Sequence, residues 1–403
     1  MVNPKLRFKK PDGTAFPDWE EKPLGSMTEI VARKAPKRSD APIMMVSQGN
    51  GFIYQADKYS RENAGQSLKN YTLLYRGEFA YNHGASKAKP YGVAYELTEE
   101  DEARVPYVYH TFRFTEGVNR FWHNSLNTSQ MDRKLKRLVS SGVRMDGLLN
   151  INYETYMGVP VAVPDETEQK AIADFFASVD EKIEAQERYV AALETQKKEL
   201  LRQVFAREIR FKDESGQDYP EWSLATVGDI IEPYDERVNN DCDLPILTSS
   251  KTEGIVFQAD HFGREQSHDI SGYCVLPRNY CTYRNRSDGV DFTFNINRLC
   301  DKGIVSKFYP VFREKGCNLY LLTLVLNNEP STTKRIAVTA AGTGQKVLSF
   351  SALQSMRIEM PSLPEQQRIA DFFTALDAQI ENERALLEDW RQLKKGLLQQ
   401  MFV

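Results

Sequence analysis

The sequence predicts an α+β protein of two tandem mixed α/β domains, each followed by a long helix, the two helices forming an antiparallel coiled coil with pseudo-twofold symmetry. Two observations predict this fold: the chain is duplicated at an offset near 200 residues, and each copy ends in a heptad pattern. A repeat of this length is far too long for a solenoid unit. It indicates a duplicated module with two equivalent working surfaces.

The duplication is visible at both edges of each copy. Residues 168–176 return 197 residues later as 365–373, with seven of nine residues identical. The segment 7–19 returns as 210–222, each copy ending in an aromatic residue, proline, an acid and tryptophan. The interiors between these edges have diverged. We therefore expect a first domain at 1–163, a first long helix at 164–207, a second domain at 208–360 and a second long helix at 361–403.

Size and composition are those of an ordinary globular protein with two or more cores. The chain has 403 residues, 41% of them hydrophobic and 27% charged. No apolar run approaches the roughly 18 residues of a membrane span; the longest, 319–326, suits a buried strand or a short helix. The five cysteines are odd in number and form no Cys-x-x-Cys, which argues against a disulfide framework or a zinc ribbon. We expect a cytoplasmic protein that does not enter a membrane.

The net charge of −4 hides an asymmetry along the chain. Residues 165–207 and 363–403 together carry −5, so the remainder sums to +1. The acidity belongs to the repeated tails, and the intervening domains are free to carry basic patches. The charge therefore permits nucleic-acid binding without establishing it.

The two tails each show apolar residues at 4,3 spacing over about five heptads, a pattern typical of a coiled coil. The predicted seam consists of Ile172, Phe176, Val179, Ile183, Val190, Leu193, Leu200 and Val204 in the first tail, and Ile369, Phe373, Leu376, Ile380, Leu387, Trp390, Leu397 and Met401 in the second. Each helix of about 40 residues would extend roughly 60 Å. The alternative is an amphipathic helix packed only on its own domain.

Polar residues interrupt both seams at matching places, Gln186 and Lys197 in the first and Glu383 and Lys394 in the second. A polar residue at such a position can fix the register of a coiled coil. Because the copies are related by a pseudo-dyad, we expect the two helices to pair with each other in antiparallel orientation.

The diverged domains share a strand pattern. Residues 79–81 resemble 281–283 as a strand that enters a polar loop. The runs 107–114, 305–312 and 356–360 are rich in β-branched and aromatic residues and are expected to be strands. A shared framework around diverged interiors suggests that the two domains perform different versions of one task.

Basic and amide side chains gather in these interiors. Lysine and arginine supply the salt-dependent grip on phosphates, and arginine, asparagine and glutamine read base edges. The candidate DNA contacts are Arg33, Lys34, Lys37, Arg38, Asn82, His83, Lys87, Lys89, Arg133, Lys134, Lys136, Arg137 and Arg144 in the first domain, and Arg284, Asn285, Arg286, Lys334, Arg335 and Lys346 in the second. A solvated face is the alternative for any one cluster. For His83 an ordinary surface position is the favoured interpretation.

Catalytic patterns are weak. Asp12, followed by Glu20, Glu21 and Lys22, formally resembles a metal-nuclease constellation, but the second copy has Ser215 and Ala225 in place of Asp12 and Lys22. The sequence contains no Walker A motif and no Asn-Pro-Pro-Phe/Tyr, and the five histidines form no His-x-x-x-His pair. We expect no active site, no metal site and no cofactor in this chain.

With the duplication, the helix starts and the variable domains in hand, the chain resembles the DNA-specificity subunit of a type I restriction–modification system. The resemblance covers essentially all 403 residues, and its strongest motif is Pro-x₃-Glu-Gln-x-x-Ile at 164–172 and 361–369. It implies two target-recognition domains that each read one half of a split double-stranded DNA site. It also implies that the helices act as a ruler and dock two methyltransferase subunits, with restriction (translocase/nuclease) subunits joining. S-adenosylmethionine, ATP and Mg²⁺ would then belong to the partner subunits.

Two other classes of function remain open at this point. The first is a stand-alone metal-dependent DNA endonuclease, for which Mg²⁺-dependent cleavage by the isolated chain would be evidence. The second is a coiled-coil scaffold that does not bind DNA, which would not retain duplex DNA at low salt even with partner subunits present.

Overall fold

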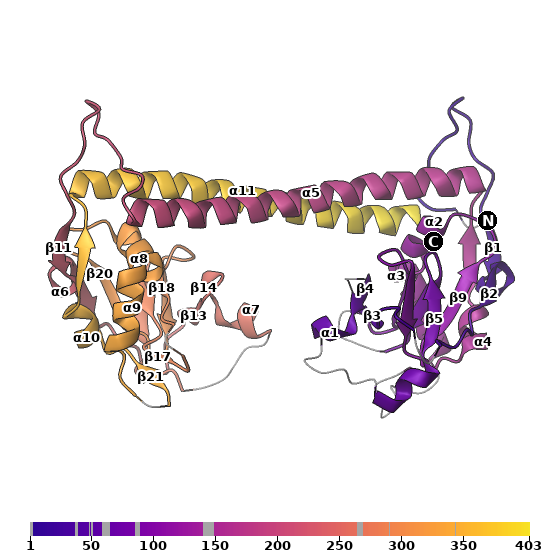
Figure 1. Ribbon diagram of the computed structural model, residues 1–403, viewed down its shortest axis with the longest axis horizontal. Helices are drawn as coiled ribbons and strands as arrows, with labels where there is room; N and C mark the ends of the chain where they lie inside the picture. The colour runs from indigo at the N-terminus through magenta and orange to yellow at the C-terminus, as the bar shows by residue number, and fades with distance from the viewer. Residues whose placement is uncertain are drawn as a thin grey trace. The chain divides into compact units, whose positions relative to one another are not determined.

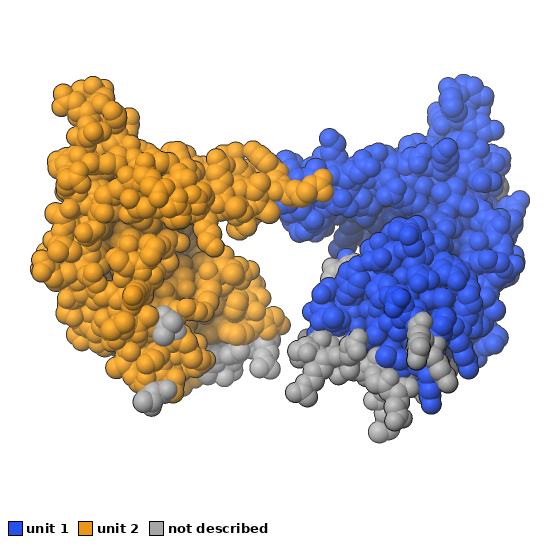
Figure 2. Space-filling model, viewed as in Figure 1, with its two compact units in different colours: residues 1–187, 385–403 blue, residues 188–384 orange. Residues whose placement is uncertain are grey.

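The computed structural model divides the chain into two compact units, residues 1–187 with 385–403 and residues 188–384 (Figure 1, Figure 2). Two long helices, α5 (Glu166–Phe205) and α11 (Leu363–Met401), each contribute one part to each unit. In the described residues no helix combines the length and the apolar character needed to cross a membrane. The structure describes residues 3–36, 39–47, 49, 51–58, 65–84, 89–139, 149–263, 269–289, 291–342 and 344–403.

The first unit is built on a four-stranded antiparallel sheet in the order β2-β9-β6-β7, with the two-stranded pairs β1–β10, β3–β4 and β5–β8 beside it. Its strands are β1 (Glu20–Pro23), β2 (Thr28–Ile30), β3 (Met44–Ser47), β4 (Gly51–Tyr54), β5 (Thr72–Tyr75), β6 (Phe79–Asn82), β7 (Val93–Glu96), β8 (Glu102–Val105), β9 (His110–Phe114) and β10 (Pro160–Val163). Its shorter helices are η1 (Leu24–Met27), α1 (Gln55–Lys58), η2 (Gly65–Asn70), α2 (Asn119–Ser125), α3 (Ser129–Leu138) and α4 (Tyr153–Met157).

The second unit repeats this plan with the order β12-β20-β16-β18 and the pairs β11–β22, β13–β14, β15–β19 and β17–β21. Its strands are β11 (Ser223–Thr226), β12 (Ile231–Tyr234), β13 (Leu247–Ser250), β14 (Gly254–Phe257), β15 (Cys274–Pro277), β16 (Cys281–Tyr283), β17 (Arg286–Ser287), β18 (Phe294–Ile296), β19 (Lys302–Val305), β20 (Val311–Glu314), β21 (Lys346–Val347) and β22 (Arg357–Met360). Its shorter helices are α6 (Val227–Ile230), α7 (Gln258–Phe262), α8 (Leu319–Asn328), α9 (Pro330–Thr339) and α10 (Phe350–Gln354). The predicted α+β class is confirmed.

The apolar run 319–326 is helical rather than extended. It forms most of α8, whose leucine and valine side chains are buried all around the helix axis. Asn318 caps this helix, because its side chain accepts a hydrogen bond from the backbone N–H of Leu321 at 3.0 Å. The cap fixes where the helix begins and resolves the ambiguity that composition alone leaves.

The long helices pair in antiparallel orientation within each unit. In the first unit Lys394 of α11 contacts Asp180 of α5, and Arg391 donates to Glu187 at 2.6 Å, so the α11 number falls as the α5 number rises. In the second unit Lys197 of α5 contacts Asp377 of α11. The two units thus contain the same lysine–aspartate pair, with the two copies of the repeat exchanged.

The seam is apolar on either side of these pairs. Ile172, Phe176, Ile369 and Phe373 are at most 1% exposed and lie in the cores of their own units. Ile183, Leu200, Leu376, Trp390 and Leu397 are half-buried, and the other predicted seam residues are buried. Each helix therefore packs against the domain that precedes it near its start and against the other helix farther along. At its end it enters the core of the other unit, where Val204 and Met401 lie.

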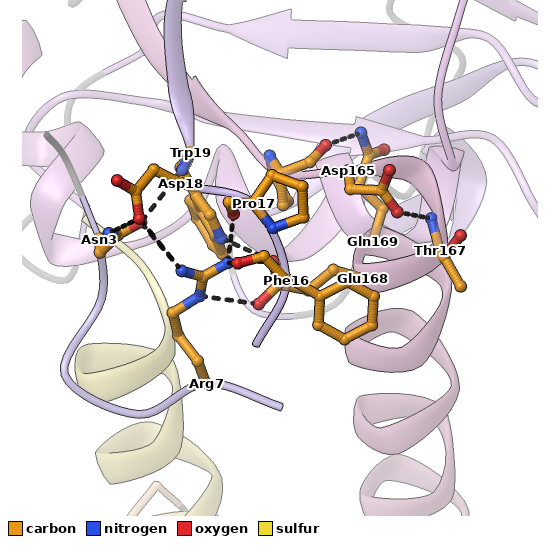
Figure 3. A network of polar contacts seen from close by, with 11 residues as sticks. Asn3, Arg7, Phe16, Pro17, Asp18, Trp19, Asp165, Thr167, Glu168 and Gln169 are labelled. Atoms are coloured by element: carbon orange, nitrogen blue, oxygen red, sulfur yellow. Dashed lines mark hydrogen bonds and ion pairs between the residues drawn. The ribbon is translucent and has the colours of Figure 1, made fainter. Parts of the chain in front are cut away.

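A buried carboxylate joins the start of α5 to the N-terminal segment of the chain (Figure 3). Glu168 is fully buried and accepts hydrogen bonds from Arg7 Nε at 3.0 Å, Arg7 Nη2 at 2.7 Å and the indole N–H of Trp19 at 3.0 Å. The same arginine donates to the carbonyl oxygen of Pro17 at 2.6 Å, which closes the turn between Arg7 and Trp19. The two repeated sequence motifs are thus one structural contact.

The neighbouring glutamine secures the residue that precedes a shorter helix of the same unit, α2 in the first unit and α8 in the second. Gln169 accepts from the N–H of Val118 at 2.9 Å and donates to the carbonyl oxygen of Pro164 at 3.0 Å. In the second unit Gln366 makes the same pair of bonds, with the N–H of Asn318 at 2.8 Å and the carbonyl oxygen of Pro361 at 2.9 Å. The Glu-Gln motif is therefore part of the internal framework.

The second copy of the carboxylate contact is less complete. Glu365 is buried, but its Oε2 has no hydrogen-bond partner among the described residues. Arg210 donates instead to Glu221 at 2.6 Å and to the carbonyl oxygen of Tyr219 at 2.6 Å, which leaves its Nε unpaired. Burial raises the pKa of Glu365, while a hydrogen bond with Trp222 opposes the rise.

The diverged interiors also keep equivalent contacts that sequence similarity does not reveal. Asn127 brackets Ala94 of β7, accepting from its N–H at 3.1 Å and donating to its carbonyl oxygen at 2.6 Å. Asn327 brackets Phe294 of β18 in the same way, both at 2.9 Å. Two ion pairs recur as well. These are Arg76–Asp101 with Arg278–Asp301, and Arg113–Glu29 with Arg313–Glu232.

The two buried glutamates, Glu168 and Glu365, predict that the two units differ in how much stability a Glu→Gln substitution removes. Glu168→Gln removes a charge that satisfies Arg7 and Trp19 in a dry site, and we expect the first unit to lose about 3 kcal/mol. Glu365→Gln should lower stability by less than half as much, because burial already raises the pKa of this carboxyl and one oxygen has no partner. Urea unfolding followed by hydrogen exchange in each unit measures both. Equal losses for the two variants would contradict this ranking.

Candidate nucleic-acid interface

Cations that already have a carboxylate partner are less available to DNA than those that do not, because a phosphate must displace the partner. Many arginines of the described residues are committed in this way. Ion pairs engage Arg7, Arg33, Arg76, Arg113, Arg202, Arg207, Arg210, Arg237, Arg278, Arg313, Arg384 and Arg391.

Arg33 is part of the internal framework of the first unit. Its Nη1 donates to Glu78 and to the carbonyl oxygen of Leu73, both at 3.0 Å, and its guanidinium lies 4.3 Å from the ring centroid of Tyr75. Glu78 is only 6% exposed, so the Arg33 guanidinium is needed beside it to neutralise its buried carboxylate. The next residue, Lys34, is exposed on a short backbone bridge to Thr72.

The favoured interpretation of His83 as a surface histidine is wrong. The residue is 6% exposed, with Nδ1 3.0 Å from the carbonyl oxygen of Leu149 and Nε2 2.9 Å from that of Val108. Its ring stacks on His110 with centroids 4.8 Å apart, and burial lowers the pKa of His110. These two rings hold the chain at 149–151 because His110 Nε2 lies 2.9 Å from the carbonyl oxygen of Ile151.

The loop after β6 is satisfied by its own contacts. Asn82 donates to the carbonyl oxygen of Val46 at 3.1 Å and accepts from the N–H of Gly84 at 3.0 Å. Lys89 donates to the carbonyl oxygen of Asn127 at 2.9 Å and lies 4.0 Å from Asp132. The described part of this loop therefore offers few free polar groups.

Helix α3 presents the most basic face of the first unit. Arg133, Lys136 and Arg137 are exposed, and within the described residues none of them forms an ion pair. Their i, i+3, i+4 spacing places them on one side of the helix. Lys134 is held differently, donating to the carbonyl oxygen of Pro160 at 3.0 Å, and burial lowers its pKa.

In the second unit the strand end that corresponds to Asn82 carries two arginines. Arg284 and Arg286 are exposed and, in the part of the chain that the structure describes, form no ion pair. They line a pocket of about 240 Å³ together with Lys251 and Ser249. Asn285 points inward, and its buried Oδ1 has no hydrogen-bond partner among the described residues. The geometry favours the arginines over the asparagine as ligand contacts.

Helix α9 carries the remaining candidates of the second unit. Lys334 is exposed and lines a groove of about 1140 Å³ that also includes Lys251 of the β13–β14 turn and Lys197 of α5. Arg335 donates to the carbonyl oxygen of Arg357, and Lys346 is half-buried in the short strand β21. Lys334 therefore lines a groove that adjoins the arginine pocket, since Lys251, Asp291 and Thr293 line both.

Four candidates, Lys37, Arg38, Lys87 and Arg144, lie outside the described residues. Sequence reasoning missed Ser249, Lys251 and Thr293, which approach the arginine loop from other strands. It also missed Phe308, whose ring centroid lies 4.1 Å from the Arg286 guanidinium. No local pattern signals these residues, because each reaches the site through tertiary packing.

The nuclease-like residues are engaged in local structure. Asp12 accepts from the N–H and hydroxyl of Thr14 at 2.9 and 2.6 Å, which fixes a turn and lowers the pKa of its carboxyl. Lys22 pairs with Glu20 at 3.2 Å on β1. In the part of the chain that was described, no three histidine, cysteine or acidic side chains are grouped so as to hold a metal ion.

Comparison with known proteins finds one family model that matches part of the chain and several solved structures of similar fold. Residues 290–389 match the family model described as Type I restriction modification DNA specificity domain. The Type-I restriction-modification system S subunit from M. genitalium is similar over 100% of this chain and 99% of its own, with 11% identity and a TM-score of 0.54. A structure from work on complex assembly and conformational transition of the type I R-M system covers 96% of this chain and 98% of its own, with 14% identity and a TM-score of 0.54.

The basic face of α3 predicts a salt-dependent contact. Replacing Arg133, Lys136 and Arg137 with glutamine should weaken binding to all duplexes and reduce the slope of log K against log salt by about 3, since each lost phosphate contact removes roughly 0.9. The matched control replaces Lys170, Lys182 and Lys198 of α5 with glutamine. These lysines are exposed, and their replacement removes the same charge. Salt-titrated fluorescence anisotropy measures both. An equal change in slope for the two triple variants would exclude α3 as a local contact.

Proposed function

We propose that this chain, which carries a type I restriction–modification DNA specificity domain and has the fold of S subunits, is the DNA-recognition subunit of a type I restriction–modification complex. It reads a bipartite double-stranded target, one half with each unit. The observation that carries the proposal is a common framework in both units combined with different sets of unpaired cations, α3 in the first and the 284–286 loop in the second.

The contacts that the two units share, and the strand ends at which they differ, support one DNA-reading surface in each unit. The ion pairs and asparagine clamps recur in both units, so each unit holds its loops on the same scaffold. The residues at the ends of the equivalent strands β6 and β16 differ in charge and in engagement. Such a pair of surfaces suits a DNA site of two unlike halves. The proposed recognition domains are 1–163 and 208–360, with the helices at 164–207 and 361–403.

The chain acts in this proposal without chemistry of its own. Asp12 and Lys22 are committed to a turn and to a strand pair, which disfavours the stand-alone endonuclease. Methyl transfer, translocation and cleavage, with S-adenosylmethionine, ATP and Mg²⁺, belong to the methyltransferase and restriction subunits. The specificity chain determines where these subunits act.

The long helices are the proposed docking surface for two methyltransferase subunits. Leu386 and Leu393 of α11 are 43% and 49% exposed and lie seven residues apart on one face of the helix. Exposed leucines on a helix whose other face already packs in a seam are available to a partner. The complex named in one of the similar structures is a type I R-M system, which supports an assembly of this kind.

The two-reader model predicts that recognition is modular. Exchanging residues 20–160 for the first recognition domain of another specificity subunit should change one half of the methylated motif and leave the other half intact. Methylation mapping in cells that carry the chimera and its methyltransferase reads the outcome. A reciprocal exchange of 223–360 serves as the control and should alter the opposite half. A chimera in which both halves change, or neither, would exclude separate readers.

Docking on α11 predicts a loss of assembly that leaves the fold intact. Leu386→Ser combined with Leu393→Ser should weaken the association with the methyltransferase by at least tenfold, since burying each leucine contributes about 1.5–3 kcal/mol. Gln392→Ser combined with Gln399→Ser has the same spacing and is the matched control. Analytical ultracentrifugation of the mixed subunits gives both affinities. Full assembly by the leucine variant would place the docking surface elsewhere.

A further inference from the structure

The arginine pocket of the second unit is small and built from three separate segments. Its volume of about 240 Å³ equals the space of roughly eight water molecules at about 30 Å³ each. Ser249 of β13, Arg286 of β17 and Thr293, which directly precedes β18, meet in its lining. This size suits one base edge or one phosphate rather than a larger ligand.

Arg286 is held in a fixed plane while its donors stay free. Its guanidinium carbon lies 4.1 Å from the centroid of Phe308. The backbone beneath it is fixed on both sides, because Asn285 N–H donates to the carbonyl oxygen of Phe308 at 2.9 Å and Arg286 pairs with Val347 of β21. Within the described residues the guanidinium forms no hydrogen bond or ion pair. A stacked guanidinium with its fork unused is preorganised for bidentate contact.

Arg284 lacks this support. It is exposed, and among the described residues it has neither a stacking ring nor a hydrogen-bond acceptor. Lys251 is partly neutralised by Asp291, 3.1 Å away. Arg284 is therefore an exposed cation that no described contact orients, which suits a phosphate, whereas Arg286 is oriented by its ring.

Two carboxylates also line the pocket, but Asp291 pairs with Lys251 at 3.1 Å and Asp288 accepts from the side-chain amide of Gln345 at 3.2 Å. The groups around Arg286 that keep unused capacity are therefore mainly donors. Ser249 Oγ already accepts from Asn295 at 2.7 Å, so its own proton is left to donate. Guanine presents two acceptors, N7 and O6, in the major groove, whereas adenine and cytosine present a donor amino group and thymine a methyl group. Among base edges, guanine offers the two adjacent acceptors that the unused fork of Arg286 matches.

We propose that Arg286, stacked on Phe308, reads the N7 and O6 of a guanine in the second half-site, and that Arg284 contacts an adjacent phosphate. The inference rests on the proposed function and assigns it a base and a residue. It applies to the second unit alone. At the equivalent strand end of the first unit, Asn82 is bonded internally and His83 is buried.

The test uses the full chain assembled with its methyltransferase on duplexes carrying the motif found by methylation mapping. Each guanine of the second half-site is replaced in turn by 7-deazaguanine, which lacks the N7 acceptor, or by inosine, which keeps N7 and O6. At one position 7-deazaguanine should weaken binding roughly 5- to 100-fold, and inosine should have little effect. Arg286→Lys should weaken binding to the unmodified duplex similarly and make 7-deazaguanine neutral.

Two further variants separate orientation from charge. Phe308→Leu removes the stacking ring and should reduce the preference for the cognate second half-site, while the salt slope is unchanged. Arg284→Gln should lower the salt slope by about one ion and keep the preference. Discrimination at the first half-site, measured in the same samples, verifies that each variant is folded.

Several results would overturn the proposal. A second half-site without a G·C pair does so directly, as does a 7-deazaguanine effect that persists in Arg286→Lys. An Arg286→Lys complex that weakens on all duplexes equally makes this residue a phosphate contact instead. If the wild-type complex prefers no sequence at all, the proposed function fails together with the inference. If it prefers its motif but ignores 7-deazaguanine, only the inference fails.

Discussion

The fold of each unit depends on joining the start of a long helix to a chain segment about 150 residues away, and in the first unit a buried carboxylate makes this joint. Glu168 has no exposure to water, so its charge is tolerated only because Arg7 and Trp19 donate to it. The contact spans 149 residues between Trp19 and Glu168. In the first unit the two repeated motifs therefore form one contact, whereas in the second unit only the hydrogen bond between Trp222 and Glu365 remains of it. Their role is architectural, and DNA contact must be sought elsewhere.

The same reasoning separates structural from available cations throughout the molecule. Arg33 and Arg286 look alike in the sequence, since each lies in a polar segment beside a strand. Tertiary structure distinguishes them, because Glu78 neutralises Arg33 whereas Arg286 rests on a ring and keeps its donors free. A cation with a buried partner is needed for stability. A cation that is oriented but unpaired within the described residues has unused binding capacity, and Arg286 is such a cation.

The sequence predicted the parts of the fold that depend on local or periodic patterns. The two long helices, their antiparallel pairing and the α+β domains follow from heptad spacing and from the duplication, and the structure confirms them. Other features depend on contacts between distant segments. The burial of His83 follows from carbonyl groups at Val108 and Leu149, and Asn127 acts on a strand 33 residues away. No local sequence pattern predicts partners that lie so far apart in the chain. Lys197 and Lys394 are an intermediate case. The heptad pattern shows that they interrupt the seam, but it does not predict their aspartate partners.

The strand ends after β6 and β16 show how one framework can support two different surfaces. Both strands are fixed by backbone pairing to a central neighbour and to an edge strand, and an asparagine side chain brackets that edge strand. In the second unit Arg284 directly follows β16 and forms no contact with a partner among the described residues. In the first unit Asn82 bonds to Val46 of β3 and to Gly84 of its own loop. Because the scaffold is stabilised by other residues, substitution at these ends changes what the surface can bind without dismantling the sheet. The two surfaces can therefore differ between the copies while the frameworks remain alike.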